Sequence, residues 1–486
     1  MNKNLEATKT LLECIESYRI KFNKPKDEKI KPLNEWDIQS LPNLPENWGW
    51  LTSNEISTFI TNGVHSPTSY FDELGINKKM LRITDIDDSG NANYLNLPYC
   101  KRFVKGDYDK TIKKNDIYIS FTGNILGKKY IVNESRDDIV FAHYFVRWQP
   151  IIVNPKYIYY VLLSSYFTNF INAYKLGSTQ PNLKVTDLKR VPLPIPPLPT
   201  QKKIAHILST LDDKIELNHK MNQTLEAMAS AIFKSWFVDS DPVHAKANCK
   251  TDAELESAAK ELGISKEILD LFPNEFDESE LGMIPKGWEL KEFSSLVKHL
   301  KPGTNYQPDR VEDGIPFVNG KHIKDGFLDL TDIKYITQDE YDRVHKSWQP
   351  EAYDVLITRI GTLGKVGVVM PSDLPLALHY NSINIKAGKL NHQFLYFLLK
   401  SDFFQKQFHT NKKQAVQEFI TIEAVEQLKI LMPNSEKIFE ILSGVFDSYF
   451  NLIESNTIHI RTLQKTRDTL LPKLLSGEID VSEMEI

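Results

Sequence analysis

The chain contains 486 residues, of which 25% are charged and 41% apolar, and its 59 Lys and Arg against 64 Asp and Glu give a formal net charge of −5. This length exceeds what one hydrophobic core organises, so two or more domains are expected, and the acidic balance argues mildly against a nucleic-acid partner. The sequence shows no apolar run typical of a membrane span or signal peptide, and its three cysteines are widely separated, so we expect a soluble, cytoplasmic protein without a disulfide framework or cysteine-ligated zinc.

The sequence contains an internal repeat with an offset close to 240 residues. In chain order, the matching segments are 45–48 with 285–288, 115–132 with 353–369, and 157–167 with 394–404. Matches that keep their order and nearly the same offset indicate a duplication. We therefore expect two similar halves, each made of a globular head followed by a long helix.

The first half begins with an extension. Residues 1–43 carry apolar residues at helical spacing and are expected to pack on the long helices or on a partner. Residues 44–199 mix short β-branched and aromatic runs with Gly, Pro and Asn, which indicates a compact α+β domain. This domain closes at 191–199, where five prolines in nine residues predict a rigid extended strap rather than a helix or a ligand for an aromatic groove.

A long helix is predicted at 200–238, because apolar residues there recur at alternating spacings of four and three, as in a coiled coil. The residues expected to pair with the second long helix are Ile204, Leu208, Leu211, Ile215, Asn218 and Asn222. A polar residue in such a seam costs stability but fixes register and partner. In the alternative, a stutter rotates the helix and buries Met221 and Met228 instead of the asparagines.

An acidic segment follows the first helix. Residues 239–280 carry twelve Asp and Glu against four Lys, a net charge of −8. We interpret 239–283 as a solvated connector with one short helix rather than as a partner-binding surface. The second head is predicted at 284–433.

The second long helix is predicted at 434–476, ended by Pro472 and Gly477, and a tail occupies 477–486. Its expected seam is Ile438, Leu442, Val445, Tyr449, Leu452, Asn456, Ile460, Leu463 and Leu470. Two similar apolar stripes are buried most simply against each other, and each helix would be about 55 Å long. The predicted fold is therefore α+β, with two duplicated globular domains separated by an antiparallel pair of long coiled-coil helices.

Catalytic motifs are absent from the sequence. The stretch 123–129 has three residues between its glycines where a phosphate loop needs four, and its repeat has two. The patterns HExxH, GxSxG, GxGxxG and Asp/Asn-Pro-Pro-aromatic do not occur, and the twelve histidines define no metal site. We therefore expect neither catalysis nor a cofactor or metal in this chain.

Each head instead offers a strand followed by a tight glycine turn with a lysine. Such a turn could hold phosphate oxygens, and polar neighbours could reach base edges, although the glycines could equally serve turn geometry alone. The candidate DNA-binding residues are Ser120, Thr122, Gly123, Lys128, Lys129, Thr358, Arg359, Gly361, Thr362 and Lys365. Around the first turn, residues 101–156 contain eleven Lys and Arg against six Asp and Glu, so the acidic total averages over unlike segments.

From about residue 44 to residue 479 the chain resembles the specificity subunit of type I restriction-modification systems. The resemblance rests on four segments in order: PLPIPPLPTQKKIAHILSTLDDKIELNHKMNQTLEAMASAIFKSWF, LFPNEFDESELGMIPKGWEL, TRIGTLGKVG and LQKTRDTLLPKLLSGEI. The glycine-serine run before a Gln that the family shows is present as Gly177-Ser-Thr-Gln180, which adds Gln180 to the candidates. In the second half this pattern degrades to Lys412-Lys-Gln-Ala-Val-Gln417.

The resemblance implies two target-recognition domains that each read one half of a bipartite double-stranded DNA site, with the long helices setting their separation. It also implies two methyltransferase subunits that methylate adenines with S-adenosylmethionine, and a restriction subunit that uses ATP and Mg. One alternative is a related system whose partner fuses methyltransferase and nuclease. Another is a scaffold protein that does not bind DNA.

Overall fold

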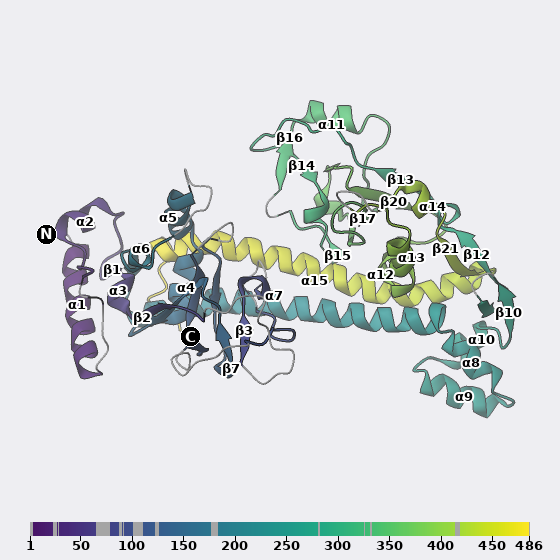
Figure 1. The fold of residues 1–486 in the computed structure, drawn as a ribbon, viewed down its shortest axis with the longest axis horizontal. Coiled ribbons are helices and arrows are strands. Elements are labelled where there is room, and N and C mark those ends of the chain that lie inside the picture. The colour runs from purple at the N-terminus through teal and green to yellow at the C-terminus, as the bar shows by residue number, and fades with distance from the viewer. Residues whose placement is uncertain are drawn as a thin grey trace. The chain divides into compact units, whose positions relative to one another are not determined.

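The computed structural model describes residues 3–22, 27, 29–64, 78–86, 90, 92–100, 110–121, 126–175, 183–279, 282–324, 326–330, 333–413 and 418–485. The chain forms two compact units (Figure 1), residues 1–216 with 461–486, and residues 217–460. Each unit therefore contains one head together with adjoining parts of both long helices. This division cuts across the seven segments predicted from the sequence, because each head packs on the helix segments beside it.

The first unit is built around a mixed head. Its strands are β1 (Gly49–Thr52), β2 (Ser57–Asn62), β3 (Lys79–Leu81), β4 (Thr111–Ile112), β5 (Ile117–Ser120), β6 (Lys129–Ile131), β7 (Arg136–Phe141), β8 (Phe145–Pro150) and β9 (Pro192–Ile195). Its shorter helices are α1 (Lys3–Lys21), α2 (Glu35–Ser40), α3 (Ser53–Ile56), α4 (Pro155–Leu163), α5 (Ser165–Lys175) and α6 (Val185–Lys189), with a 3-10 turn at Ile83–Asp85. The strands form sheets ordered β2-β8-β5-β6, β3-β7-β4 and β1-β9.

The second head has the same plan. Its strands are β12 (Trp288–Glu292), β13 (Val297–Pro302), β14 (Ile315–Val318), β15 (Gly326–Phe327), β16 (Lys334–Ile336), β17 (Val355–Thr358), β18 (Val366–Val368), β19 (Ala377–Leu378), β20 (Ser382–Ala387) and β21 (Lys429–Pro433). Its helices are α11 (Gln338–Val344), α12 (His392–Lys400), α13 (Asp402–Thr410) and α14 (Ile422–Glu426), with 3-10 turns at Phe293–Ser295, Gly320–His322 and Pro371–Asp373. The sheet orders are β13-β20-β17-β18-β15, β16-β14-β19 and β12-β21.

The duplication predicted from the sequence is confirmed by this topology. The order β13-β20-β17-β18 repeats β2-β8-β5-β6, and the parallel pair β14 with β19 repeats β3 with β7. The register repeats as well, since Tyr118 lies opposite Arg147 and Leu356 lies opposite Asn384. In this core the two copies are offset by 238 residues in the first strand and by 237 in the second.

Two long helices, α7 (Leu198–Phe233) and α15 (Glu436–Ser476), contribute to both units. In the first unit Arg467 binds Asp212 at 2.9 Å and Lys203 donates to the carbonyl oxygen of Ser482. In the second unit Asn222 contacts Asn456 and, further along α7, Phe233 contacts Phe446. Residue numbers rise on one helix as they fall on the other, so the helix segments are antiparallel in each unit, as expected.

The seam follows the predicted spacing on α7. Ile204, Leu208, Ile215 and Ala229 are buried, Leu211, Asn218 and Asn222 are half-buried, and Met221 and Met228 are 44% and 49% exposed. The rotated alternative, in which the methionines are buried, is therefore wrong. The side chain of Asn222 occupies the seam because its amide finds partners on α15.

On α15 the buried stripe is rotated slightly from the predicted one. Leu442, Asn456 and Ile460 are buried, and the predicted residues Ile438, Val445, Tyr449, Leu463 and Leu470 are half-buried. Leu452, however, is 52% exposed while Ile453 is 1% exposed, so the placement of Leu452 in the seam is wrong. The reason is that α15 also packs on the second head. The ring of Phe446 lies 5.8 Å from the ring of Phe394 on α12, so part of the buried face of α15 is turned toward α12.

Two expectations about prolines are corrected. Pro472 lies inside α15 rather than ending it, and the helix continues to Ser476 before Gly477 takes a left-handed φ of 74°. Burial of Leu474 and Leu475 in the core of the first unit stabilises this last turn despite the missing amide. The strap 191–199 is extended through β9, but Pro199 lies in the first turn of α7, where a proline is tolerated.

The acidic segment 239–283 is more structured than a solvated connector. After a π-helical turn (Lys234–Val238) it forms α8 (Asp241–Ala247), α9 (Asp252–Glu261), α10 (Lys266–Leu271) and strand β10 (Phe276–Ser279), which pairs with β11 (Gly282–Pro285). Val243 and Phe272 are buried in the core of the second unit. Buried apolar residues such as these lie between charged residues and anchor the segment, a pattern that the net charge alone does not reveal.

The N-terminal extension packs on the first head. Asn4 donates to the carbonyl oxygens of Leu44 and Trp48, and the hydroxyl of Thr8 accepts the amide of Trp50 at 3.0 Å. Helix α1 thereby covers β1.

Candidate nucleic-acid interface

Both heads carry a glycine turn closed by a buried hydroxyl. The Oγ of Ser120, at the end of β5, accepts the amide of Lys128 at 3.0 Å. The Oγ1 of Thr358, at the end of β17, accepts the amide of Lys365 at 2.9 Å. Both side chains are fully buried. These two candidate residues therefore join the chain segments that flank each turn, and their hydroxyls are bonded inside the hairpin.

The glycines of the second turn have distinct surroundings. Gly361 and Gly364 take φ values of 78° and 81°, which favour glycine over residues with a side chain. A Cβ on Gly364 would approach the side chain of Gln405 to 2.3 Å, whereas a Cβ on Gly361 would meet no neighbouring atom. Gly364 is thus required by packing as well as by conformation, and Gly361 lies at the open tip beside the exposed Thr362.

The candidate lysines of the first head have internal contacts. The Nζ of Lys128 donates to the carbonyl oxygen of Ile86 at 2.6 Å, and the Nζ of Lys129 lies 5.2 Å from the centre of the Phe167 ring. Thr122, Gly123 and Gln180 lie outside the described residues. In the second head Lys365 and Arg359 are half-buried.

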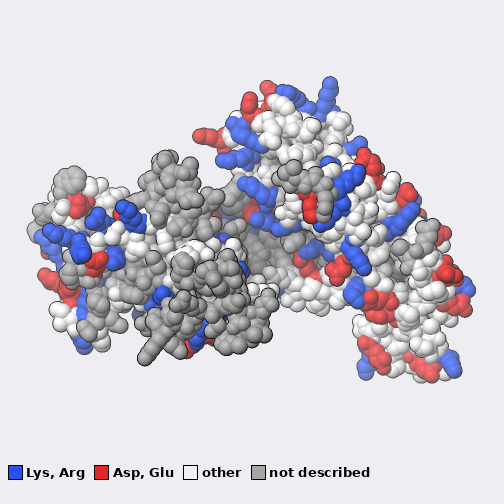
Figure 2. Space-filling view, in the orientation of Figure 1, with Lys and Arg blue, Asp and Glu red and all other residues white. Residues whose placement is uncertain are grey.

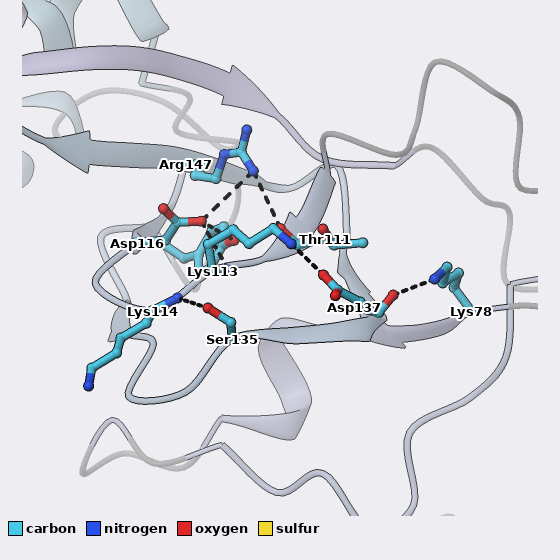
Figure 3. Close-up of polar contacts among 9 residues, drawn as sticks. Lys78, Thr111, Lys113, Lys114, Asp116, Ser135, Asp137 and Arg147 are labelled. Carbon is cyan, nitrogen blue, oxygen red and sulfur yellow. Dashed lines mark hydrogen bonds and ion pairs between the residues drawn. The ribbon is translucent and has the colours of Figure 1, made fainter. Parts of the chain in front are cut away.

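A buried aspartate directly precedes the strand that leads to each turn. In the first head Asp116 lies 3.8 Å from the guanidinium of Arg147, which also donates to the carbonyl oxygen of Thr111 (Figure 3), and Asp116 accepts the amide of Gln149 at 2.8 Å. Burial raises the pKa of Asp116, while Gln149 and Arg147 oppose the rise. Nearby, Asp137 binds Lys113 and its carbonyl oxygen accepts Lys78 (Figure 3). These ion pairs lie within the segment 101–156, whose excess of basic residues already counts both aspartates.

The second head repeats this arrangement with an amide in place of the guanidinium. The carboxylate of Asp354 accepts hydrogen bonds from the side-chain amide of Asn384 at 2.8 Å and from the backbone amide of Glu351 at 2.9 Å. Burial again raises the pKa of the aspartate. Asn384 occupies the register position that Arg147 has in the first head. The repeated aspartates are thus parts of the core rather than groups that face a ligand.

A second turn, which sequence reasoning missed, lies beside each glycine turn. It joins β7 to β8 in the first head and β19 to β20 in the second. The amide of Phe121 donates to the carbonyl oxygen of Tyr144, and that of Arg359 donates to the carbonyl oxygen of Asn381. Gly63 and Gly303 pass so close to these turns that a Cβ would lie 2.2–2.3 Å from a carbonyl oxygen. The backbone of the two turns is therefore held in the same way in both heads.

The side chains at these equivalent backbone positions differ. The bridges Val64–Ala142 and Thr304–His379 are parallel in both heads, so Ala142 corresponds to His379 and His143 to Tyr380. Phe121, which follows Ser120, corresponds to Arg359, which follows Thr358. The His-Tyr pairs at 143–144 and 379–380 would align at an offset of 236 by sequence, one residue away from the structural register. The His-Tyr match in the sequence therefore pairs residues that are not equivalent in the structure.

Charge is unevenly distributed over the second unit. Figure 2 shows Lys and Arg side chains gathered on the head near β14 and β15, and Asp and Glu side chains gathered over α8–α10 and β10. Among the described residues, no three His, Cys, Asp or Glu side chains are grouped as metal ligands. Within the same residues no helix is long and apolar enough to cross a bilayer.

Two α+β heads with one shared scaffold and different side chains at equivalent turn positions define a duplicated two-domain protein. Residues 71–227 and 285–460 match the family model described as the type I restriction modification DNA specificity domain. The chain therefore belongs to the family of type I restriction-modification specificity subunits, which are non-catalytic components of those systems.

Individual relatives agree with this family. The chain is 30% identical over 419 residues to the type I restriction enzyme HindI specificity subunit of Haemophilus influenzae, a match that covers 77% of this chain and 89% of that protein. It is 27% identical over 339 residues to the MjaIX specificity subunit of Methanocaldococcus jannaschii, covering 68% and 70%. A crystal structure of the S subunit from M. genitalium covers 90% of this chain and 97% of its own, with 15% identity and a TM-score of 0.47.

Proposed function

We propose that this chain gives a type I restriction-modification complex its DNA sequence specificity, and that each head reads one short word of a bipartite double-stranded site. The observation that carries the proposal is the contrast between the two heads. They share the buried hydroxyl, the buried aspartate and the close glycine, yet differ at Phe121 and Arg359 and at the neighbouring turn. A shared scaffold with unlike side chains at equivalent turn positions suits two different words.

The chemistry is assigned to partner subunits. We propose two methyltransferase subunits that methylate adenine with S-adenosylmethionine, and a restriction subunit that uses ATP and Mg. The family supports this division of labour, and the sequence offers no catalytic motif of its own. In this proposal the long helices set the distance between the words, and a pair of helices about 55 Å long corresponds to roughly one to two turns of duplex.

The proposal is tested by sequencing the methylome of cells that produce this chain together with its methyltransferase. The expected result is a motif of two short words, each with a methylated adenine, separated by an unread gap of fixed length. A continuous motif would contradict the proposal that each head recognises its own word.

Exchange of one head provides a second test. When residues 44–199 are replaced by the corresponding domain of a relative, one word should change while the other word and the gap stay the same. If both words changed together, the heads would not act independently.

Two alternatives make different predictions. A related system with a fused methyltransferase-nuclease partner would purify with two kinds of subunit rather than three. A scaffold protein would leave duplex binding by the complex unchanged when the turns of both heads are mutated, for example at Phe121 and Arg359.

A further inference from the structure

The three arginines of the second head differ in their ionic contacts. Arg343 pairs with Glu340 at 3.5 Å. Arg310 and Arg359 form no ion pair within the described part of the chain, and the Nε of the half-buried Arg359 has no hydrogen-bond partner there. Burial lowers the pKa of the half-buried Arg359, although the nearby carboxylate of Glu423 opposes the shift, and desolvation also lowers the pKa of the exposed Arg310. A ligand that accepts hydrogen bonds would give the Nε of Arg359 a partner.

Arg310 is held by an aromatic platform rather than by a carboxylate. Its guanidinium lies 4.1 Å from the centre of the Phe317 ring, and the same ring meets the imidazole of His379 edge-on at 5.8 Å. The Nε2 of His379 in turn lies 3.4 Å from the Nε2 of Gln307. Stacking of this kind fixes the plane of the guanidinium and leaves its N–H groups available.

The backbone of Arg359 is hydrogen-bonded to the turn that carries His379 and Tyr380. The amide of Arg359 donates to the carbonyl oxygen of Asn381 at 2.9 Å, and the amide of Tyr380 donates to that of Thr304 at 2.9 Å. Gly303 packs directly against this turn, where a Cβ would lie 2.3 Å from the carbonyl oxygen of Leu378. The turn that carries His379 and Tyr380 is therefore fixed relative to both arginines.

We propose that Arg310, Arg359, His379 and Tyr380 form the base-reading surface of the second head, and that its arginines recognise guanine in the major groove. Arginine presents two parallel donors to O6 and N7 of guanine, the commonest specific contact between protein and DNA. This inference rests on the proposed function and adds to it the residues and the base that one word requires.

The repeat distinguishes base reading from a grip on phosphate. Both heads must hold the DNA backbone, so a phosphate contact should recur in both, whereas a contact that reads a word should differ. The equivalent of Arg359 is Phe121, and the equivalent of His379 is Ala142.

The test uses the complex of the full chain with its methyltransferase subunits and selects bound duplexes from a random library. The variants are Arg310→Met and Arg359→Met, which keep apolar length and remove the guanidinium. Arg343→Met in the same head is the matched control. Thermal unfolding of each purified variant establishes that the second head is folded.

The expected result is that Arg359→Met and Arg310→Met each relax one guanine position of the second word and leave the first word intact. Loss of one bidentate contact should lower discrimination at that position by about fivefold to a hundredfold, and Arg343→Met should change neither word. Uniformly weaker binding with an unchanged word would identify phosphate contacts and overturn the inference. A second word without any G·C pair would also overturn it, while wild-type complex that binds no bipartite site would overturn the proposed function itself.

Discussion

The side-chain amide of Asn456 donates to the side-chain oxygen of Asn222 at 2.8 Å, across the seam between α15 and α7. Asn222 in turn donates to the hydroxyl of Thr457 at 3.2 Å and to the carbonyl oxygen of Ile453 at 3.4 Å. Asn456 is 8% exposed, and the nearest seam residues along α15, Ile453 and Ile460, are buried and apolar. A polar pair of this kind adds little net stability, but it strongly disfavours any pairing that leaves either amide without a partner.

Breaking this pair on one side should cost more than removing it altogether. Asn456→Ala removes the donor to the side-chain oxygen of Asn222 and should destabilise the seam by about 1–3 kcal/mol. The double change Asn222→Leu with Asn456→Leu should be close to neutral or stabilising. Hydrogen exchange of the α7 and α15 amides near these residues measures both, and the exposed Met221→Ala serves as a control. A double variant less protected than Asn456→Ala would show that the pair stabilises the seam by itself.

Arg19 should be required for the stability of the first head. Its guanidinium is 4% exposed and donates to the carbonyl oxygens of Asn54, Glu55 and Ser57, at the end of α3. Arg19→Met leaves these buried acceptors unsatisfied and should cost about 2–4 kcal/mol, since each hydrogen bond to a charged group contributes about 1.5–3 kcal/mol. The exposed Lys21→Met is the matched control. Equal hydrogen exchange of α3 and β1 in both variants would contradict this role.

The second head should lose stability at acidic pH through His345. Its Nε2 accepts the amide of Leu378 at 3.3 Å and its Nδ1 lies 3.1 Å from the carbonyl oxygen of Trp348, so the neutral ring satisfies both. Burial lowers the pKa of His345 below its usual 6.5, and the bond to Trp348 opposes this. Because the folded pKa is depressed, the contribution of this group to stability is present above pH 6.5 and is lost as pH falls through the folded pKa.

The measurement is thermal unfolding of the full chain between pH 5 and pH 8. Burial also lowers the pKa of His299, His379 and His392, so acidification should weaken the second head by more than one group. His345→Leu should be less stable than wild type at pH 8 but should have a shallower decline below pH 6.5. An unchanged slope would exclude His345 as a contributor.

The hydroxyls that close the glycine turns should affect stability rather than sequence recognition. Thr358→Val removes the acceptor for the amide of Lys365, and Ser120→Ala removes that for Lys128, each at a cost of about 1–2 kcal/mol. Both words of the methylome should remain the same when the variants are produced at a temperature where they fold. A changed word in either variant would place the hydroxyl at the DNA instead.

The sequence by itself determined the duplication, the order of heads and helices, and the asparagines of the seam. These features follow from repeats and from helical periodicity, which depend on residues close together in the chain. Periodicity underestimated the structure of the connector at 239–283. Its buried apolar residues, Val243 and Phe272 among them, are spaced irregularly between charged residues.

Tertiary structure alone decided which of two adjacent apolar residues on α15 faces the core. Leu452 and Ile453 both fit a coiled-coil stripe, and only packing of α15 against α12 selects Ile453. Tertiary structure also set the register by which Ala142 corresponds to His379, because strand pairing fixes that register and a turn carries no periodic signal. The surface proposed to read the second word is built from such turns, so its residues came together only in the folded chain.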